Sequence, residues 1–566
     1  MASVRRSKAS KLTMHSRSNG TSIRIANSIL FRASAAQSSS ATIMQARSVA
    51  SVFLLLSLHG LLCLQLHLVA SAEIDDGVEF EPGSFCHLPV SPPVVPHSAE
   101  ERHEHYRAME AKDLLRHRRI TMMVGSGSRR QARESSKLPE VMSDASMFEL
   151  PMRSAINIAH VGMYIVSVRF GTPALPYNLV LDTATDLTWI NCRLRRRNGK
   201  HYGRPHVQQS PTANTLSVDG EGAPVKVIKN WYRPAMSSSW RRFRCSQQAC
   251  AVLPYNTCES PNQTASCSYR QVVQDGTTTS GIYGQEKATV ALSGGRMAKL
   301  PGLILGCSTF EAGDSVDSHD GVLSLGNSDV SFGIHAAKRF GARFSFCLLS
   351  THSGRNASSY LTFGSNPAVK AQDTMETTLN YNPDMVAYGA RVTGITLGGE
   401  LLDIPPEVWD QAIVGAGMVL DTGTSVTGLV PSAYAAVTTA LDSHLGHLQR
   451  VTNIAGFEFC YNWTFTGDGV DPAHNVTIPK FTVELEGGAR LEPDAKSVVM
   501  PEVVPGVACL AFRKLPSGPG IFGNVLMQEH IWEFDHMDEK LRFRKDKCIN
   551  HHLNPNNSSS PNHHPA

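Results

Sequence analysis

The chain of 566 residues lacks several signatures that would assign it to a common class of enzyme or binding protein. It contains no CxxC pair and no cysteine/histidine cluster with zinc-finger spacing, which argues against a structural metal site. A G-x-S-x-G elbow and a P-loop are also missing, so neither a serine hydrolase nor a P-loop nucleotide-binding protein is indicated. The formal net charge of only +4 gives no argument for a nucleic-acid partner. We expect neither a metal nor a cofactor.

Acidic residues are missing from residues 1–72. Within this region, residues 49–71 form an apolar run that resembles a signal peptide, with Met44 as an alternative start. A membrane anchor is the competing interpretation, although two His and one Gln inside the run weaken it. The Ser/Arg-rich residues 1–45 also resemble a plastid transit peptide, so a chloroplast destination stays open beside the secretory pathway.

The cysteines favour an oxidising compartment. Cys63 lies in the apolar run and Cys86 in an expected prosegment, which leaves ten of the twelve cysteines, an even number, for disulfides. Triplets of the N-x-S/T type agree with passage through the secretory pathway, towards the apoplast or a vacuole. They begin at Asn262, Asn356, Asn462, Asn475 and Asn557.

From Tyr164 onward the chain has the pattern of an all-β protein. Short β-branched runs such as YIVSVRF and YNLVLD are separated by Gly, Pro and Asn, and such runs continue to Phe543. Helical periodicity is scarce, and the one long candidate is 431–448. The composition, 42% hydrophobic and 18% charged, is that of an ordinary globular protein.

An approximate internal repeat lies within this β pattern. Residues 180–189 read VLDTATDLTW and residues 419–428 read VLDTGTSVTG. Each half continues with a later element in which apolar residues precede a glycine, DGVLSLGN at 320–327 and GIFGNV at 520–525. The repeat predicts a duplicated lobe, with Asp182 and Asp421 placed at a shared interface.

These motifs together resemble a known family. The region from Tyr164 to Cys548 is similar to pepsin-type aspartic proteases of family A1, and within them to the plant nepenthesin-like branch, including NANA-type proteases. The shared phrases are YIVSVRFGTP, LDTATDLTWINC, GRMAKLPGLILGCS, FSFCL, LLDIPPEVWD, VLDTGTSVTGL, FCYN, GVACLAF and GNVLMQEHIWEFD. The resemblance implies two pseudo-twofold-related β-lobes in a peptidase domain at 164–544, with lobes at 151–365 and 366–550, and a disordered tail at 551–566.

The resemblance also implies the chemistry. Asp182 and Asp421 would share one proton and hold a water between them, which attacks an internal peptide bond at acid pH. The substrates would be proteins or peptides, and the enzyme would be a monomer without stable membrane association after processing. Four threonines would support the pair: Thr183 and Thr422 by cross-bracing the two loops, and Thr185 and Thr424 by hydrogen bonds to the outer carboxylate oxygens. Cys460 and Cys509 match the pair that joins the C-terminal lobe.

Two features depart from the family pattern. Ala184 stands where the family usually has Gly; its N–H can still donate to the carboxylate, but its Cβ adds bulk beside the water. The flap, 267–281, keeps Asp275 and Gly276 but has Val273 in place of the substrate-covering Tyr, so Trp189 loses its usual partner. Reduced activity is therefore expected, and a non-catalytic peptide-binding or inhibitor protein is the alternative.

Residues 73–150 are expected to form a prosegment, as in a zymogen. Residues 100–130 combine a basic helical pattern with a cleavable stretch. Such a segment could cover the active site, its Arg and Lys side chains paired with the carboxylates until low pH protonates them. A solvated charged helix without a regulatory role is the alternative.

Overall fold

The computed structural model describes 147–154, 162–195, 201–202, 217–218, 224–225, 230–258, 264–272, 278–292, 296–312, 319–350, 359–381, 386–409, 417–454, 456–465 and 469–548, and seven residues within 107–117. The apolar run 49–71, most of the expected prosegment and the tail 551–566 lie outside these residues. The seven described residues within 107–117 are helical, and we call this part segment 107–117. Among all described residues, no helix has both the length and the apolar character needed to span a bilayer.

The first half of the repeat is built around β3 (Leu175–Asp182). Strand β13 (Gly321–Ser324) lies parallel to β3, with Ser324 opposite Asp182. On the other side of β13 runs β4 (Trp189–Asn191) in the antiparallel direction, and β4 in turn lies parallel to β12 (Met297–Ala312). The apolar element predicted at 320–327 therefore pairs directly with the strand that ends at the first aspartate.

The second half of the repeat has the same order and directions. Strand β21 (Met418–Asp421) lies parallel to β32 (Ile521–Gly523), with Gly523 opposite Asp421. The antiparallel neighbour of β32 is β22 (Thr427–Leu429), which runs parallel to β31 (Phe512–Lys514). Four strands of each half thus correspond one to one, which confirms the two-lobed all-β fold expected from the repeat.

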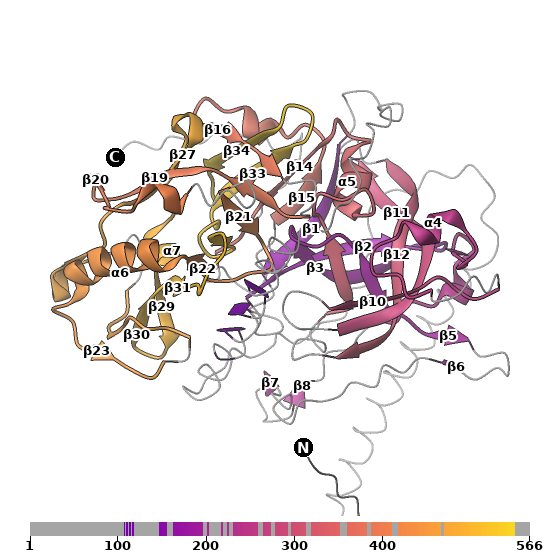
Figure 1. Ribbon diagram of the computed structural model, residues 1–566, viewed down its shortest axis with the longest axis horizontal. Helices are drawn as coiled ribbons and strands as arrows, with labels where there is room; N and C mark the ends of the chain where they lie inside the picture. Colours follow the sequence, from indigo (N-terminus) through magenta and orange to yellow (C-terminus); the bar gives the residue numbers. More distant parts are fainter. Residues whose placement is uncertain are drawn as a thin grey trace, which may run out of the picture. The chain divides into compact units, whose positions relative to one another are not determined.

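One large sheet continues from the first half into the last strands of the chain (Figure 1). Strand β1 (Phe148–Ser154) pairs with β2 (Tyr164–Phe170) and β15 (Ser359–Phe363), and so begins three residues before the lobe boundary expected at 151. Strand β14 (Arg343–Cys347) then pairs with β33 (His530–Asp535). The chain end therefore completes the sheet of the first half.

Aromatic packing fills the core along this sheet. The rings of Phe344 and Phe534 stack across β14 and β33 with centroids 4.8 Å apart, and Phe148 stacks on Phe363 at 4.7 Å. All four side chains are fully buried. Burial of such large apolar surfaces on both sides of the strands is the main stabilising contribution here.

The only long helix among the described residues is α6 (Pro431–Leu445), close to the helix predicted at 431–448. Pro431 occupies its first turn, where the missing N–H has no consequence. The buried positions Ala433, Val437 and Leu441 recur at helical spacing and face the sheet.

The remaining elements are mostly short, apart from the 15-residue strand β11, which pairs with β10 and β12. The helices are α4 (Gln248–Ala251), α5 (Phe332–Ala337) and α7 (Ala495–Val498), with 3-10 turns at Pro234–Met236, Pro367–Lys370, Pro406–Val408, Pro472–His474 and Glu486–Gly488. The strands are β5 (Leu194–Arg195), β6 (His201–Tyr202), β7 (Ser217–Val218), β8 (Pro224–Val225), β9 (Arg241–Arg242), β10 (Ser268–Val272), β11 (Thr278–Leu292), β16 (Met375–Thr378), β17 (Asn380–Tyr381), β18 (Tyr388–Ala390), β19 (Val392–Leu397), β20 (Glu400–Leu401), β23 (Arg450–Val451), β24 (Cys460–Asn462), β25 (Val470–Asp471), β26 (Val476–Thr477), β27 (Phe481–Leu485), β28 (Arg490–Leu491), β29 (Val499–Val504), β30 (Val507–Leu510) and β34 (Lys540–Lys545).

The ten cysteines from Cys192 onward all form disulfides, as the even number predicted. The pairs are Cys192–Cys307, Cys245–Cys258, Cys250–Cys267, Cys347–Cys548 and Cys460–Cys509. The last pair is the one that the resemblance implied. Cys347–Cys548 fixes the end of the described chain to β14, because Cys347 closes that strand.

Candidate active site

The two repeat aspartates lie at the ends of equivalent strands, and both are buried. Asp182 is the last residue of β3 and Asp421 the last of β21, with exposed fractions of 2% and 0%. Two ionisable carboxylates held out of water in this way need compensating donors or charges. The groups around them supply both.

Two threonines brace the loops that follow these strands. The backbone N–H of Thr183 donates to Oγ1 of Thr422 at 3.2 Å, and the N–H of Thr422 donates to Oγ1 of Thr183 at 3.1 Å. Each hydroxyl donates onward to a carbonyl of the opposite strand, Thr183 to Leu420 of β21 and Thr422 to Leu181 of β3. The reciprocal bonds fix the two aspartate-bearing loops against one another, as the resemblance implied.

Backbone amides hold one oxygen of each carboxylate. The N–H of Ala184 donates to Oδ1 of Asp182 at 2.9 Å, and the N–H of Gly423 donates to Oδ1 of Asp421 at the same distance. Ala184 does not adopt a positive φ. Its methyl group packs in a buried apolar cluster with four residues of the second half, Ala387, Val419, Leu515 and Ile521. The Ala therefore keeps the hydrogen bond that the Gly supplies in the other loop.

The outer carboxylate oxygens of the two aspartates accept hydrogen bonds from different donors. Oγ1 of Thr424 donates to Oδ2 of Asp421 at 2.6 Å, as expected. The matching expectation for Thr185 is wrong in this structure, since its buried Oγ1 has no hydrogen-bond partner among the described residues. The donor to Oδ2 of Asp182 is instead Nη1 of Arg116, at 3.0 Å. A guanidinium thus takes the place expected for the threonine hydroxyl.

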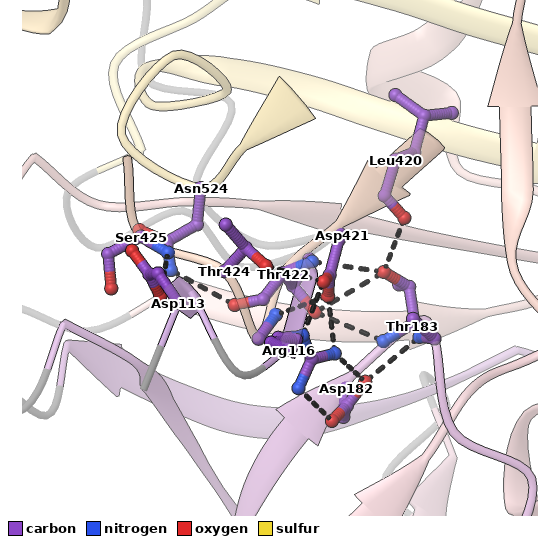
Figure 2. A network of polar contacts seen from close by, with 12 residues as sticks. Asp113, Arg116, Asp182, Thr183, Leu420, Asp421, Thr422, Thr424, Ser425 and Asn524 are labelled. Atoms are coloured by element: carbon purple, nitrogen blue, oxygen red, sulfur yellow. Dashed lines mark hydrogen bonds and ion pairs between the residues drawn. The ribbon is translucent and has the colours of Figure 1, made fainter. Parts of the chain in front are cut away.

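Arg116 of segment 107–117 lies between the two carboxylates (Figure 2). Its Nη2 donates to Oδ1 of Asp182 at 2.7 Å and also to Oδ1 of Asp421, while Nε donates to Oδ2 of Asp421. Because a single nitrogen is hydrogen-bonded to both carboxylates, one small polar group can reach both at once. This is the geometry that the repeat was expected to create.

One positively charged guanidinium lies between two carboxylates inside a buried site. Arg116 is 2% exposed. Burial lowers the pKa of its guanidinium, but Asp182 and Asp421 more than offset this and raise the pKa well above its ordinary value. Arg116 therefore stays charged at acid and neutral pH, and a fall in pH can weaken the ion pairs only from the carboxylate side.

Gly423 is required for this contact. A Cβ at this position would lie 2.4 Å from Cζ and Nη1 of Arg116. Real Cβ atoms essentially never approach another heavy atom so closely, so any larger residue here would displace the guanidinium.

His117, the next residue of the segment, is also buried, and the backbone of Ser517 accepts a hydrogen bond from its ring.

Comparisons with known proteins agree with this geometry. A family model described as xylanase inhibitor N-terminal matches residues 164–365, and one described as xylanase inhibitor C-terminal matches residues 387–545. Aspartyl protease AED1 of Arabidopsis thaliana is 29% identical over 407 residues, covering 72% of this chain and 76% of that protein. Aspartic proteinase nepenthesin-2 of Nepenthes gracilis is 26% identical over 443 residues, covering 77% and 87%.

The chain belongs to the family defined by this pair of N-terminal and C-terminal domains, and it is similar to plant aspartyl proteases. Two solved structures share its fold. The protein edgp has a TM-score of 0.54 and 18% identity, covering 72% of this chain and 96% of that chain. Basic 7S globulin from soybean has a TM-score of 0.52 and 17% identity, covering 71% and 97%. At such low identity the likeness shows the fold alone.

The flap of this family corresponds to the β10–β11 hairpin, in which Val272 pairs with Thr278. Val273, Asp275 and Gly276 lie outside the described residues. Trp189, which the family pairs with a flap Tyr, is buried, and its ring lies edge-on to that of His319 at 5.9 Å. Tyr269 lies at the base of the hairpin, where its hydroxyl contacts Thr279 at 3.3 Å.

Two of the predicted glycosylation acceptors, Asn462 and Asn475, are exposed. Asn262, Asn356 and Asn557 lie outside the described residues. Exposure is what an acceptor asparagine needs, so the two described positions remain predicted sites.

The sequence did not identify every residue of the site. The basic stretch pointed to segment 100–130, but Arg116 could not be chosen among its many basic residues. Asn524 was also missed, although its side chain donates to the carbonyls of Thr422 and Gly162 at 3.0 and 2.7 Å and so ties the second loop to the entry of β2. Its signal was the GNV phrase at the end of the repeat element 520–525.

Proposed function

We propose that the chain is an aspartic endopeptidase whose precursor is held inactive by Arg116. The observation that carries the proposal is the shared nitrogen: Nη2 of Arg116 is hydrogen-bonded to Asp182 and to Asp421. A water that replaced this nitrogen would meet the same two carboxylates, which is what water activation requires.

In the reaction the pair would share one proton, because two carboxylates this close do not both ionise readily. The ionised member takes a proton from the water as the water oxygen attacks the peptide carbonyl carbon. The protonated member donates to the carbonyl oxygen, giving a neutral tetrahedral intermediate. Breakdown transfers a proton to the amine, breaks the C–N bond and restores the shared proton. The N–H groups of Ala184 and Gly423 keep both carboxylates oriented through these steps.

Acidification would open the precursor. As pH falls, protonation of Asp182 and Asp421 removes the charges that pair with Arg116, and segment 107–117 loses its strongest contact. A zymogen of this kind suits passage through the secretory pathway to the apoplast or a vacuole, and the five disulfides support an oxidising route. A plastid destination is the alternative. After processing we expect a monomer without stable membrane association that acts on proteins or peptides.

A non-catalytic peptide-binding or inhibitor protein is the second candidate. It is favoured by the description of both matching family models as xylanase inhibitor domains, and by Ala184 and Val273 at positions where the family usually has Gly and Tyr. The same bilobal fold would then present the carboxylate pair to a partner without hydrolysis.

The decisive experiment is proteolysis by the full-length protein after acid treatment. A denatured protein substrate is incubated at pH values from about 3 to about 6, with and without pepstatin. We expect cleavage that pepstatin blocks and that Asp421→Asn abolishes, whereas Asp373→Asn, on an exposed aspartate whose side chain is 67% accessible, leaves it unchanged. No cleavage by folded protein that has lost residues 107–117 would favour the second candidate.

A further inference from the structure

A second carboxylate of the segment lies in a built binding site. Oδ1 of Asp113 accepts a hydrogen bond from the N–H of Ser425 and Oδ2 accepts one from the N–H of Val426, both at 3.2 Å (Figure 2 shows Asp113 beside Ser425). Nη1 of Arg513 lies 3.6 Å from Oδ2 of Asp113. Two backbone amides and a guanidinium around one carboxylate form a typical anion site.

Arg513 has unused capacity to bind an anion. It is the middle residue of β31, paired with Gly428, and is 8% exposed. Its Nη1 donates to the carbonyl of Glu110 at 3.0 Å. Within the part of the chain that the structure describes, its Nε and Nη2 have no hydrogen-bond partner. Burying a guanidinium with unpaired donors is costly, so a fold that keeps one is expected to gain from an anion bound beside it.

The site lies one helical turn from the carboxylate pair. Asp113 and Arg116 are three residues apart, and such residues in a helix are neighbours about 5–6 Å apart at Cβ. Both contacts made by Arg513 in this region, to Asp113 and to Glu110, come from segment 107–117. Departure of the segment therefore frees Arg513 and the two amides together with Asp182 and Asp421.

We propose that Arg513 and the backbone N–H groups of Ser425 and Val426 form a carboxylate-binding subsite for substrate. The subsite takes the side chain of an Asp or Glu residue of a peptide bound along the surface that segment 107–117 covers. Asp113 is the occupant in the precursor. Cleavage next to such a residue rests on the proposed function, but binding of an acidic peptide does not.

The first test measures peptide binding, which does not require catalysis. The protein is the full-length Arg116→Gln variant, whose own segment is loosened. The probes are end-blocked peptides with the sequence of residues 105–119, carrying either Asp or Asn at position 113. At about pH 6.5 we expect the Asp peptide to bind about tenfold more tightly, with intact peptide confirmed by mass spectrometry.

Adding Arg513→Gln should reduce this preference to about onefold, while Arg513→Lys should retain part of it. Arg490→Gln, on an exposed arginine of β28, is the matched control and should leave the tenfold preference intact. The preference should also disappear as pH falls below about 4, because the peptide carboxylate is then protonated. A preference that Arg513→Gln leaves unchanged, or that is absent at the outset, would overturn the proposal.

The second test asks whether substrates use the subsite. The acid-treated full-length protein is given a peptide library, and the cut positions are read by mass spectrometry. We expect Asp or Glu to be enriched several-fold at one fixed distance from the cut bond, and Arg513→Gln to remove the enrichment. Cleavage without enrichment would show that the site serves only the precursor, against the proposal. A library left uncut would count against the proposed function, and the binding test alone would then decide the subsite.

Discussion

Ala184 and Gly423 occupy matching places in the two halves, and the N–H of each donates to Oδ1 of its own aspartate at 2.9 Å. The hydrogen bond from the backbone N–H thus forms whether the residue is Ala or Gly. What differs is the surroundings: the methyl of Ala184 packs among apolar residues, whereas Gly423 is covered by the guanidinium of Arg116.

Ala184→Gly is therefore expected to change the rate of proteolysis by less than about threefold, because the hydrogen bond to Asp182 remains. The variant should lose about 1 kcal/mol of unfolding free energy, from the lost methyl contact and the greater entropy of the unfolded chain. Denaturant unfolding and steady-state proteolysis measure the two effects. A rate gain above about tenfold would mean that the methyl group, and not the flap, limits activity.

Gly423→Ala should open the precursor at a pH where the natural chain stays closed. The added Cβ would lie 2.4 Å from Cζ of Arg116, so the guanidinium must shift, and its contacts with both carboxylates are expected to weaken. Since Ala184 keeps the matching bond to Asp182, alanine at 423 is expected to keep the bond to Asp421. Pepstatin at about pH 6 should then raise the melting temperature of the full-length variant and not that of the natural full-length chain.

Arg116→Gln should give the same response for a different reason, the loss of charge. Removal of one partner from a buried ion pair costs about 3–5 kcal/mol. The two substitutions control for each other, because Gly423→Ala fills the space that the guanidinium occupies and Arg116→Gln removes its charge. If neither variant responds to pepstatin although both remain folded, segment 107–117 does not gate the carboxylate pair.

His117 should make opening of the precursor easier between pH 6.5 and 4. Burial lowers the pKa of His117 to about 4, partly opposed by its hydrogen bond to the backbone of Ser517, from an ordinary value of 6.5. Above pH 6.5 the ring is neutral whether the segment is docked or free. As pH falls from 6.5 to 4, only the free segment takes up the proton, so the docked form loses up to ~3 kcal/mol; below about 4 both forms are protonated and nothing more is lost.

His117→Gln should consequently shift the midpoint of acid activation down by about half a pH unit or more. The midpoint is measured as the pH at which half of the full-length chain has lost its N-terminal fragment after a fixed time. His444→Gln, on an exposed histidine of α6, is the control and should leave the midpoint in place. A shift of equal size in both variants would mean that the overall charge of the protein, and not the burial of His117, sets the midpoint.

The fold and the paired aspartates could be predicted because the information is local and repeated. The VLDT phrases and the later glycine-containing elements recur in both halves, which predicted a duplicated lobe with one aspartate in each half. The parallel pairing of β3 with β13 and of β21 with β32 came from the structure. Ten cysteines in even number predicted disulfides, although only the pairing of Cys460 with Cys509 was implied by the resemblance.

The contacts of the segment could not be predicted, since they join residues 66 to 403 positions apart through complementary shape and charge. Arg116 and Asp421 are separated by 305 positions, and Asp113 and Val426 by 313. The spacing of Asp113 and Arg116 on one helical face is visible in the sequence, but which groups they meet depends on packing. The sequence also could not show that the hydroxyl of Thr185 has no hydrogen-bond partner among the described residues. Its expected acceptor, Oδ2 of Asp182, accepts a hydrogen bond from Arg116 instead.

Thr424 and Thr185 provide a matched test of whether a hydroxyl next to each aspartate supports catalysis. Oγ1 of Thr424 donates to Asp421 at 2.6 Å, whereas Oγ1 of Thr185 has no partner among the described residues. Valine preserves the shape of threonine and removes only the hydroxyl. Thr424→Val should lower the rate about tenfold or more, since a hydrogen bond to a charged group contributes about 1.5–3 kcal/mol, and should move the acidic limb of the pH–rate profile to higher pH. Thr185→Val should change neither by more than about threefold, because no bond is lost. Equal losses in the two variants would mean that Thr185 contacts Asp182 once the segment has left.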